Sequence, residues 1–445
     1  MSDAEAAERT GYGRGAAILS VGIGVTGLIT YAYFALASHT LSEHDYGEIT
    51  LLWSAVFVTV SVLYRPVEQL LSRTIADRHQ RGLEGNSHLR VAATIQLGLG
   101  LLFAVAALAL RGPLKDDLFN GSETLYWVLI VAVLAYAVSY FARGFLAGHH
   151  RFGLFSGLVF MEAVSRCLFA LAVAVGIASG QSVVALGIAA APIVSLAVVP
   201  WALRRRLPEP TAAAPEVESA DVRALDEAAA GEPGGEPEFT LANGTGFAVA
   251  VLLIMLAEQT FLNAGPLLVK ATEGAEGAAL AGFVFNVLLI ARAPLQLFQA
   301  VSTSILPHLT RLRASGEGDP FRRSVNVTLL AIAGFAGTVA LGMLAIGPWV
   351  MDLVFGGEQA YDRGGLVLIS VGMGLYLVAA TLNQALVARA RAGVASICWL
   401  ATAVAYVAFL LVPGIDDRVL QVEVGFTGAA LVLCTLLGTL YRRSH

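Results

Sequence analysis

The residues best suited to chemistry in this 445-residue chain are charged side chains that lie inside long apolar stretches. A charge in the hydrocarbon region of a membrane is costly, so such a side chain usually faces a cavity or a partner. The planar guanidinium of arginine holds phosphate oxygens through paired hydrogen bonds, and an intramembrane glutamate can serve ion coupling or gating. The set comprises Arg65, Arg143, Arg166 and Arg292, with Glu68, Glu162 and Glu258.

Arg65 and Arg292 each have a proline within two residues and occupy nearly equivalent places in the two halves of the chain. We predict that both face one cavity, where two guanidinium groups would hold a pyrophosphate. The adjacent prolines would loosen the helices at this level. Snorkelling of Arg65 to lipid headgroups is the alternative interpretation. Arg143 and Arg166 are further candidates for the same cavity.

Three glutamates are candidates for ion coupling or gating. Glu162 precedes Arg166 by four residues, a spacing that favours an ion pair within one helix. That pair would be structural, or it would act as a gate that responds to protons. Glu258 would couple transport to a cation or would hydrogen-bond a neighbouring helix. Glu68 follows Arg65 by three residues and joins the coupling candidates.

Neutral polar residues extend the candidate site into the second half of the chain. Gln296, Asn383 and Gln384 offer amide groups that suit sugar hydroxyls or water. The chain has no phosphate-binding loop of the G-x-x-x-x-G-K-[ST] type, and its three cysteines lie in apolar stretches without metal-ligand spacing. We therefore predict no enzymatic activity and no cofactor, with coupling to H⁺, Na⁺ or the membrane potential left open.

The elements that position these residues must cross a membrane. Hydrophobic residues make up 57% of the chain and charged residues 14%, with a mean hydropathy of +0.72. A soluble chain has about 25% charged residues, so too little polar surface is available here to cover a soluble particle. The net charge of −5 gives no support for a nucleic-acid partner.

Windows of about 20 apolar residues predict twelve membrane-spanning helices. The runs are too long and too continuously apolar for barrel strands, so the predicted fold is an all-α membrane bundle. The predicted spans cover residues 16–37, 47–71, 91–110, 124–145, 153–178, 182–203, 244–264, 278–304, 327–349, 365–387, 394–412 and 423–441.

The distribution of positive charge predicts the orientation. If the N-terminus is cytoplasmic, 19 of the 28 Lys and Arg residues lie on the cytoplasmic side and only five on the other. Positive residues concentrate in cytoplasmic loops, so we predict a multi-pass protein of the cytoplasmic membrane with both termini cytoplasmic. The five on the opposite side are Arg111, Lys115, Lys270, Arg363 and Arg418.

An acidic segment divides the chain into two halves. Residues 207–240 are rich in Pro and Ala and carry nine acidic residues against one arginine, which predicts a disordered cytoplasmic linker. The linker would be a spacer, or it would regulate the protein or bind a partner. We therefore predict an N-terminal six-helix lobe over residues 1–206 and a C-terminal six-helix lobe over residues 241–445.

The two halves carry related sequences at corresponding places. The segment from Arg143 to Gly153 aligns without a gap with the segment from Asn383 to Gly393, and Arg151 matches Arg391. Both segments end the fourth span of their half. We therefore predict a parallel duplication of six helices, an architecture that places a cavity between the lobes and permits alternating access.

Several of these segments resemble a known family. The stretch Leu41-Ser-Glu-His-Asp-Tyr-Gly47, the Arg65-Pro-Val-Glu-Gln run, the turn from Arg143 to Arg151 and the run from Arg292 to Pro307 are similar to polysaccharide-exporter flippases. These flippases belong to the multidrug/oligosaccharidyl-lipid/polysaccharide (MOP) exporter superfamily, which includes the MATE transporters. The resemblance covers nearly the whole chain in the number of spans, the linker position and the orientation.

The resemblance implies a transporter that moves a lipid-linked oligosaccharide between the leaflets by alternating access. It implies that cavity arginines, here Arg65 and Arg292, bind the pyrophosphate of a polyprenyl carrier. Membrane lipids, polysaccharide polymerases and glycosyltransferases are the partners that such a role implies. The sequence lacks the two further helices common in lipid II flippases.

Two other functions remain open. A cation-coupled multidrug antiporter would carry an acidic pair. The seventh span has Glu258, but the tenth span has Asn383 and Gln384 in place of a second acid. A membrane scaffold that does not transport, with a degenerate cavity, would tolerate the loss of the intramembrane charges.

Overall fold

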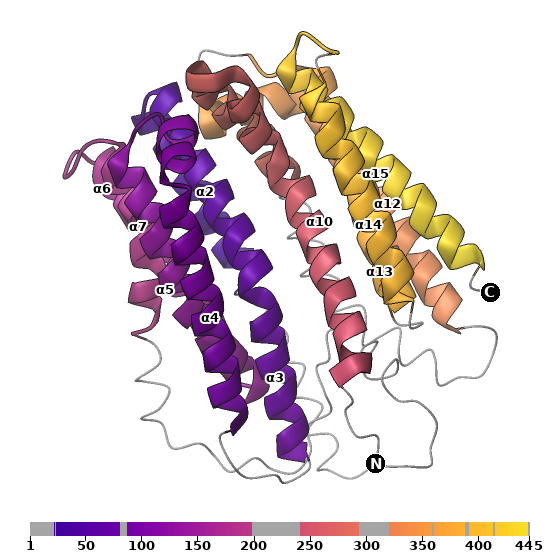
Figure 1. Ribbon diagram of the computed structural model, residues 1–445. Helices are drawn as coiled ribbons and strands as arrows, with labels where there is room; N and C mark the ends of the chain where they lie inside the picture. The colour runs from indigo at the N-terminus through magenta and orange to yellow at the C-terminus, as the bar shows by residue number, and fades with distance from the viewer. Residues whose placement is uncertain are drawn as a thin grey trace, which may run out of the picture.

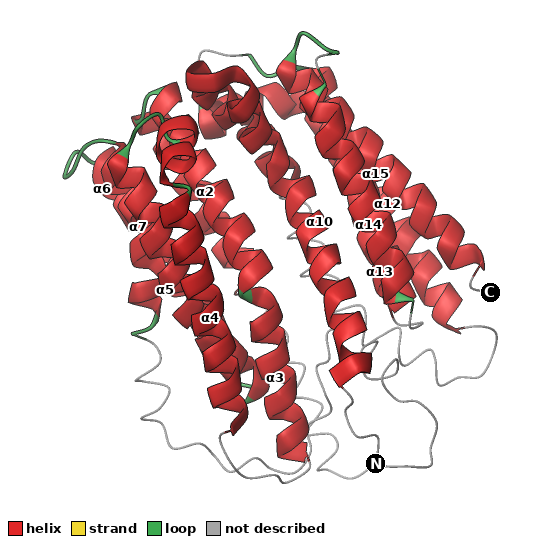
Figure 2. Ribbon diagram, in the orientation of Figure 1, coloured by secondary structure: helices red, strands yellow, loops and turns green. Residues whose placement is uncertain are grey.

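The computed structural model describes residues 22, 24–80, 87–197, 241–292, 320–357, 360–387, 391–412 and 414–443. Every regular element within these ranges is a helix (Figure 2). The described helices of the N-terminal half form one bundle and most of those of the C-terminal half form another, with α10 between them in the view of Figure 1. The predicted linker over residues 207–240 lies outside the described residues, so its predicted disorder and the domain boundaries stay predictions.

The N-terminal half contains helical residues 24–40 followed by the labelled helices. These are α2 (Glu43–Leu63), α3 (Arg65–Gln80), α4 (Ser87–Ala109), the short π-helix η1 (Pro113–Leu118), α5 (Glu123–Gly148), α6 (Phe152–Ala174) and α7 (Gln181–Ser195).

The C-terminal half contains α10 (Leu241–Glu273), the 3₁₀ turn η2 (Gly274–Glu276), helical residues 277–292, α12 (Pro320–Phe355), α13 (Arg363–Val387), α14 (Ala392–Leu411) and α15 (Arg418–Arg443).

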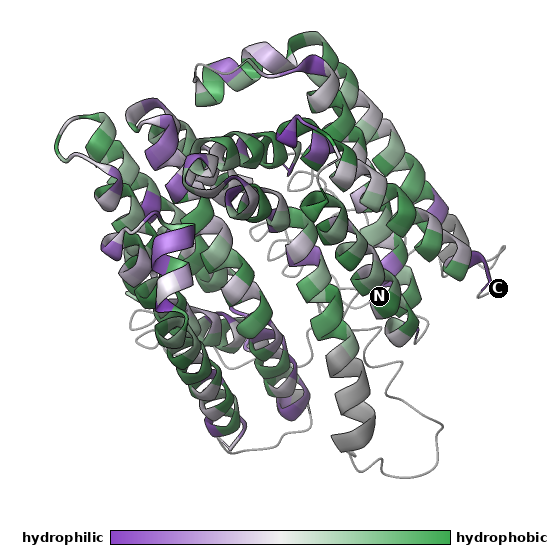
Figure 3. Cartoon of the chain, turned by 45° about the horizontal axis from the view of Figure 1, so that its top comes forward, coloured by the Kyte–Doolittle hydropathy of each residue, from purple (hydrophilic) through white to green (hydrophobic). Residues whose placement is uncertain are grey.

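Each of the twelve predicted spans overlaps helical residues in the described part of the chain. Nine apolar helical stretches there are long enough to cross a membrane, and α7 is a shorter apolar helix of 15 residues. Figure 3 shows hydrophobic residues along the helix lengths and hydrophilic ones mainly near their ends. Large apolar side chains of α4 and α12 are exposed, among them Leu97 at 74% and Leu330 at 75%. This surface suits lipid, which confirms a multi-pass membrane protein.

The predicted span 47–71 is two helices with a break at Tyr64. Pro66 has no N–H to donate to the carbonyl four residues earlier, so the α2 hydrogen-bond ladder stops there. Tyr64 caps α2 by donating its N–H to Val60 O at 2.9 Å, and Arg65 opens α3. The interruption is short, since Glu68 donates its N–H to Tyr64 O at 3.0 Å, and the loosening predicted beside this arginine stays a prediction.

α10 is longer than predicted, because it continues through Pro266 to Glu273. Gly265 permits close packing at this level, since a Cβ added there would lie 2.9 Å from Val422 Cγ1 on α15. The helix therefore carries Lys270 inside the fold instead of leaving it in a loop. Its 33 residues correspond to about 50 Å, well over the hydrocarbon thickness of about 30 Å.

The two aligned segments form the same turn. Arg151 precedes α6 and donates its N–H to the carbonyl of Leu146 at 2.9 Å, five residues earlier. Arg391 precedes α14 and donates to Leu386 in the same way at 3.0 Å. The correspondence between the halves therefore extends from sequence to backbone geometry.

The halves meet at the upper end in Figure 1, where α2 begins and α10 ends. Gly47 of α2 lies against the backbone of the 277–292 helix, and a Cβ added to Gly47 would lie 1.8 Å from Ala278 O. A Cβ on Gly282 would lie 2.9 Å from the Cα of Gly47. Lower on the same helix, the Tyr31 hydroxyl donates to Leu289 O at 2.7 Å. The two bundles are therefore in backbone contact at this end.

Candidate functional site

Glu162 is the centre of a polar cluster among three helices of the N-terminal bundle. Its side chain is 2% exposed, and Arg143 of α5 donates Nη2 to its Oε2. Ser139 Oγ of α5 donates to Oε1 at 2.5 Å, and Ser195 Oγ of α7 lies 3.5 Å from the same atom. A buried carboxylate needs partners of this kind, so Glu162 ties α6 to α5 and α7.

The predicted ion pair between Glu162 and Arg166 is wrong. Arg166 instead donates Nη1 to the Tyr136 hydroxyl at 2.7 Å, and its guanidinium lies 5.0 Å from the ring centroid of Trp53 and 5.7 Å from that of Phe57. Cation–π contacts of this kind stabilise a desolvated arginine. The packing of α5 against α6 supplies partners for both residues, which a spacing rule for one isolated helix does not consider.

Arg65 and Glu68 lie close to this cluster, in the first turn of α3. The charges of Arg65 and Arg143 both act on the Glu68 carboxylate, as does that of Glu162. The two helices pack closely here, since a Cβ on Gly144 would lie 2.7 Å from Glu68 O. Arg65 itself is exposed. The structure thus brings together three of the predicted arginines with two of the predicted glutamates.

Arg292 is held differently from Arg143 and Arg166. Its Nε and Nη2 atoms are buried and have no hydrogen-bond partner among the described residues. Three tyrosines, Tyr31, Tyr376 and Tyr406, are close enough for their hydroxyls to act on its charge. Nε–H and the Nη2–H that points the same way form the side-on fork with which arginine binds carboxylate or phosphate. The buried fork of Arg292 therefore has the geometry of an anion site.

Tyr376 connects the two clusters. The charges that act on its hydroxyl come from Glu258 and Arg292 in the C-terminal half and from Arg65 in the N-terminal half. Asn383, on the same helix as Tyr376, is 7% exposed, and its Oδ1 has no partner among the described residues. Gln384 is exposed, and Gln296 lies outside the described residues.

The sequence prediction missed the side chains that hold these charges. Tyr136, Ser139, Tyr140 and Arg143 lie at positions i, i+3, i+4 and i+7 of α5, so all four share one helix face. Arg143 also lies over the Tyr140 ring at 4.6 Å. This polar stripe could have predicted that the face of α5 holds buried charges, because a face that packs on lipid or on an apolar core would be apolar.

The apolar helices define a polytopic membrane protein that buries clusters of charged residues. Structures of MATE transporters share this fold. The chain aligns with an inward-facing multidrug resistance MATE family transporter of the MOP superfamily at a TM-score of 0.63 and 13% identity, over 96% of this chain and 97% of that one. It aligns with a Vibrio cholerae MATE transporter at a TM-score of 0.59 and 15% identity, over 98% of each chain.

Residues 12–223 match the family model described as polysaccharide biosynthesis protein. The chain is also 24% identical over 400 residues to the uncharacterized protein Rv3630 of Mycobacterium tuberculosis (strain ATCC 25618 / H37Rv), which covers 87% of this chain and 83% of that protein. The match over residues 12–223 agrees with the predicted resemblance to polysaccharide exporters, and the predicted MATE-like fold is confirmed. The comparisons also support a membrane transporter, and they leave the substrate open.

Proposed function

We propose that the protein transports a lipid-linked oligosaccharide across the cytoplasmic membrane by alternating access. The buried unpartnered fork of Arg292 carries this proposal. Leaving two charged donors buried without acceptors is costly, so a ligand that supplies two oxygens there gains that free energy. A pyrophosphate group supplies such oxygens, and the match to polysaccharide biosynthesis proteins supports a glycan carrier as its source.

The four intramembrane arginines divide into two groups on this proposal. Arg143 is neutralised by Glu162, and Arg166 is held by Tyr136 and two aromatic rings, so both serve the packing of the N-terminal bundle. Arg292 offers its fork, and the charge of exposed Arg65 in the other bundle acts on Tyr376, as the charge of Arg292 does. Binding between these two arginines would let one ligand contact both bundles, as alternating access requires.

The test is a flipping assay with purified protein in liposomes. The probe is a fluorescent short-chain prenyl pyrophosphate, whose transfer between leaflets is followed by quenching with an impermeant reductant. Arg292→Gln should slow transfer about tenfold or more, because one charged hydrogen bond contributes about 1.5–3 kcal/mol. Arg111→Gln is the matched control, since Arg111 pairs with Glu123 at the surface. Equal rates in wild-type and Arg292→Gln liposomes would reject the proposal.

A cation-coupled multidrug antiporter is the second candidate, favoured by Glu258, whose charge acts on Tyr376 beside Arg292. Uptake of ethidium into the same liposomes, driven by a H⁺ or Na⁺ gradient and abolished by Glu258→Gln, would establish it. Flipping of the prenyl pyrophosphate without ethidium transport would reject it. The absence of both activities would support the scaffold alternative.

We further propose that both termini are cytoplasmic and that a polymerase or glycosyltransferase works with the transporter. The 19-to-5 distribution of positive residues supports the orientation. Reporter fusions that are active on only one side of the membrane, placed at the C-terminus and after Gly357, test it. The two fusions should report opposite sides.

A further inference from the structure

A second polar network lies at the upper end of the molecule in Figure 1, away from the arginine site. It joins Glu48 of α2, Asn120 of the loop before α5, Gln181 of α7 and Lys270 of α10. Glu48 is 3% exposed and Lys270 is 1% exposed. The chemistry proposed above uses none of these residues, so burying two charges here needs a separate explanation.

Asn120 bridges the two buried charges. Lys270 Nζ donates to Asn120 Oδ1 at 2.5 Å, and Asn120 Nδ2 donates to Glu48 Oε1 at 2.9 Å. A carboxamide can accept from a cation with its oxygen and donate to an anion with its nitrogen at the same time. An aspartate could not donate to Glu48, and an apolar residue could do neither. The backbone φ of Asn120 is 47°, a left-handed conformation that asparagine adopts more readily than most residues.

The bonds of this network differ in whether they cross between the bundles. Glu48 takes both of its hydrogen bonds from the N-terminal bundle, since Gln181 Nε2 donates to its other oxygen. Lys270 keeps two partners in its own half, Gly274 O at 2.8 Å and Ala275 O at 3.4 Å, and takes Asn120 from the opposite half. When the bundles separate, Glu48 therefore remains satisfied while Lys270 exchanges Asn120 for water.

The bundles also meet beside this network. The Tyr46 hydroxyl donates to Asn286 Oδ1, and Asn286 Nδ2 donates to the Tyr361 hydroxyl at 3.2 Å. Burial raises the pKa of Tyr361 to about 12, so its hydroxyl remains neutral at physiological pH. Together with the backbone contact at Gly47, these bonds join the two bundles at this level.

We propose that Asn120 and Lys270 form a latch that holds the two bundles together at this end, and that the latch breaks once in each transport cycle. The proposal rests on the transport function proposed above. Glu48 fixes the orientation of the Asn120 amide, so that its oxygen always faces Lys270. The crossing bonds are one charge-assisted hydrogen bond, from Lys270 to Asn120, and one long bond, from Asn120 Nδ2 to Ala275 O at 3.4 Å. Together they are strong enough to favour the closed state and weak enough to open on the timescale of transport.

The test measures the distance between the bundles directly and uses no substrate. In a variant without the native cysteines, spin labels are attached at Ile177→Cys and Asp416→Cys, which are exposed on opposite bundles at the upper end. Pulsed electron resonance in lipid nanodiscs then gives the distance distribution. Asn120→Gly removes the bridging amide and retains the left-handed backbone. It should raise the ratio of open to closed populations about tenfold.

Lys270→Met removes the other partner of the bond and should have the same effect. Because both changes break the same bond between Lys270 and Asn120, the double variant should open no further than the more open single variant. A distance distribution unchanged by both single substitutions, or additive effects in the double variant, would overturn the latch.

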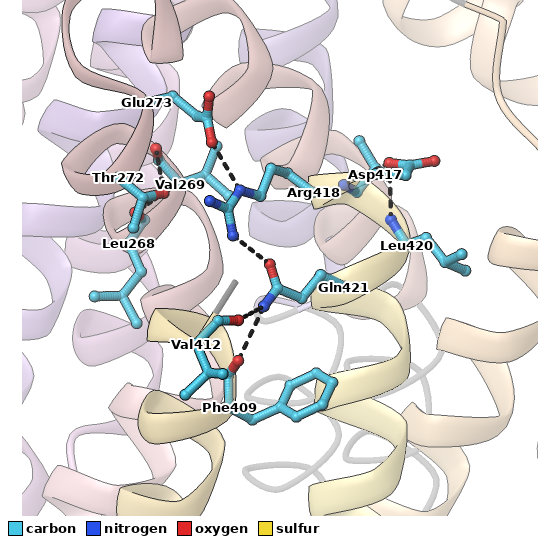
Figure 4. Close-up of polar contacts among 11 residues, drawn as sticks. Leu268, Val269, Thr272, Glu273, Phe409, Val412, Asp417, Arg418, Leu420 and Gln421 are labelled. Atoms are coloured by element: carbon cyan, nitrogen blue, oxygen red, sulfur yellow. Dashed lines mark hydrogen bonds and ion pairs between the residues drawn. The ribbon is translucent and has the colours of Figure 1, made fainter. Parts of the chain in front are cut away.

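Gln421→Ala is the matched control. Gln421 is also a buried amide at the upper end, but it bonds only within the C-terminal half (Figure 4). Its Nε2 donates to Phe409 O and Val412 O, and its Oε1 accepts from Arg418, which pairs with Glu273 at the end of α10. This substitution should leave the distances unchanged, and an equal shift would contradict the latch. If the distances respond as expected but no prenyl pyrophosphate is flipped, the substrate assignment fails and the latch stands.

Discussion

At the scale of single residues, the intramembrane charges differ in how fully they are paired. Glu162 has three polar partners from two neighbouring helices, whereas two atoms of the Arg292 fork have none among the described residues. A fully partnered charge maintains the packing of its bundle, and an unpartnered one is available to a ligand. Substitutions of these two residues should therefore affect different measurements.

We expect Glu162→Gln to destabilise the protein without a specific effect on the Arg292 site. It would leave Arg143 buried beside a neutral amide, and breaking a buried ion pair costs about 3–5 kcal/mol. The unfolding midpoint in detergent should therefore fall clearly. Glu123→Gln, which breaks an exposed pair with Arg111, should leave the midpoint nearly unchanged, because water and salt screen a surface ion pair. Equal midpoints for Glu162→Gln and the wild type would show that the Glu162 cluster is not structural.

Arg292→Gln should have the opposite effect on stability. Removing a buried cation that has no described partner relieves a desolvation cost, so the unfolding midpoint should stay constant or rise while transfer of the prenyl pyrophosphate slows. A fall in the midpoint as large as that of Glu162→Gln would indicate that Arg292 is paired in the folded protein and serves its structure.

At the scale of elements, the close packing of α3 on α5 places Glu68 and Arg65 beside the Glu162 cluster. We expect Gly144→Ala to separate these helices, because the new Cβ would lie 2.7 Å from Glu68 O. Overpacking of this kind costs about 1–3 kcal/mol, and it would move Arg65 relative to Tyr376. Thermal unfolding and the flipping assay should both show the change.

Gly98→Ala is the control for this substitution, since nothing lies within 4 Å of the added Cβ on α4. Alanine is the better helix former by about 1 kcal/mol, so stability should be equal or higher. If both variants behave alike, close packing at Gly144 does not position the site.

The helices themselves were predictable, because the hydrocarbon region demands about 20 apolar residues for each crossing. The partners of the charges were harder to predict, since Tyr136 and Arg166 meet only through the packing of α5 on α6. Lys270 was assigned to a loop because the predicted span ended at residue 264, but α10 continues through Pro266 to Glu273. The local rules therefore located the charged residues, and the contacts between helices decided what each one does.

At the scale of the whole molecule, the described contacts between the bundles concentrate near Gly47. We expect Gly47→Ala to prevent closure at the upper end, because the added Cβ would lie 1.8 Å from Ala278 O. This oxygen belongs to the backbone, so it cannot move away by a change of side-chain rotamer. The spin-label distances should shift to the open population, and flipping should slow. Gly24→Ala, with nothing within 4 Å of the added Cβ, is the control. A closed population equal to that of the wild type would show that the glycine contact does not govern closure.

The contact of Gly47 with Ala278 and Gly282 also has an evolutionary consequence. The two halves of the chain pack tightly at this contact, so a larger residue on one half requires a smaller residue on the other. Among relatives with this fold, the residues equivalent to 47 and to 278–282 should therefore change in concert, and a chimera that joins halves from two relatives should fail here first. Restoring small residues on both sides of the contact should rescue such a chimera.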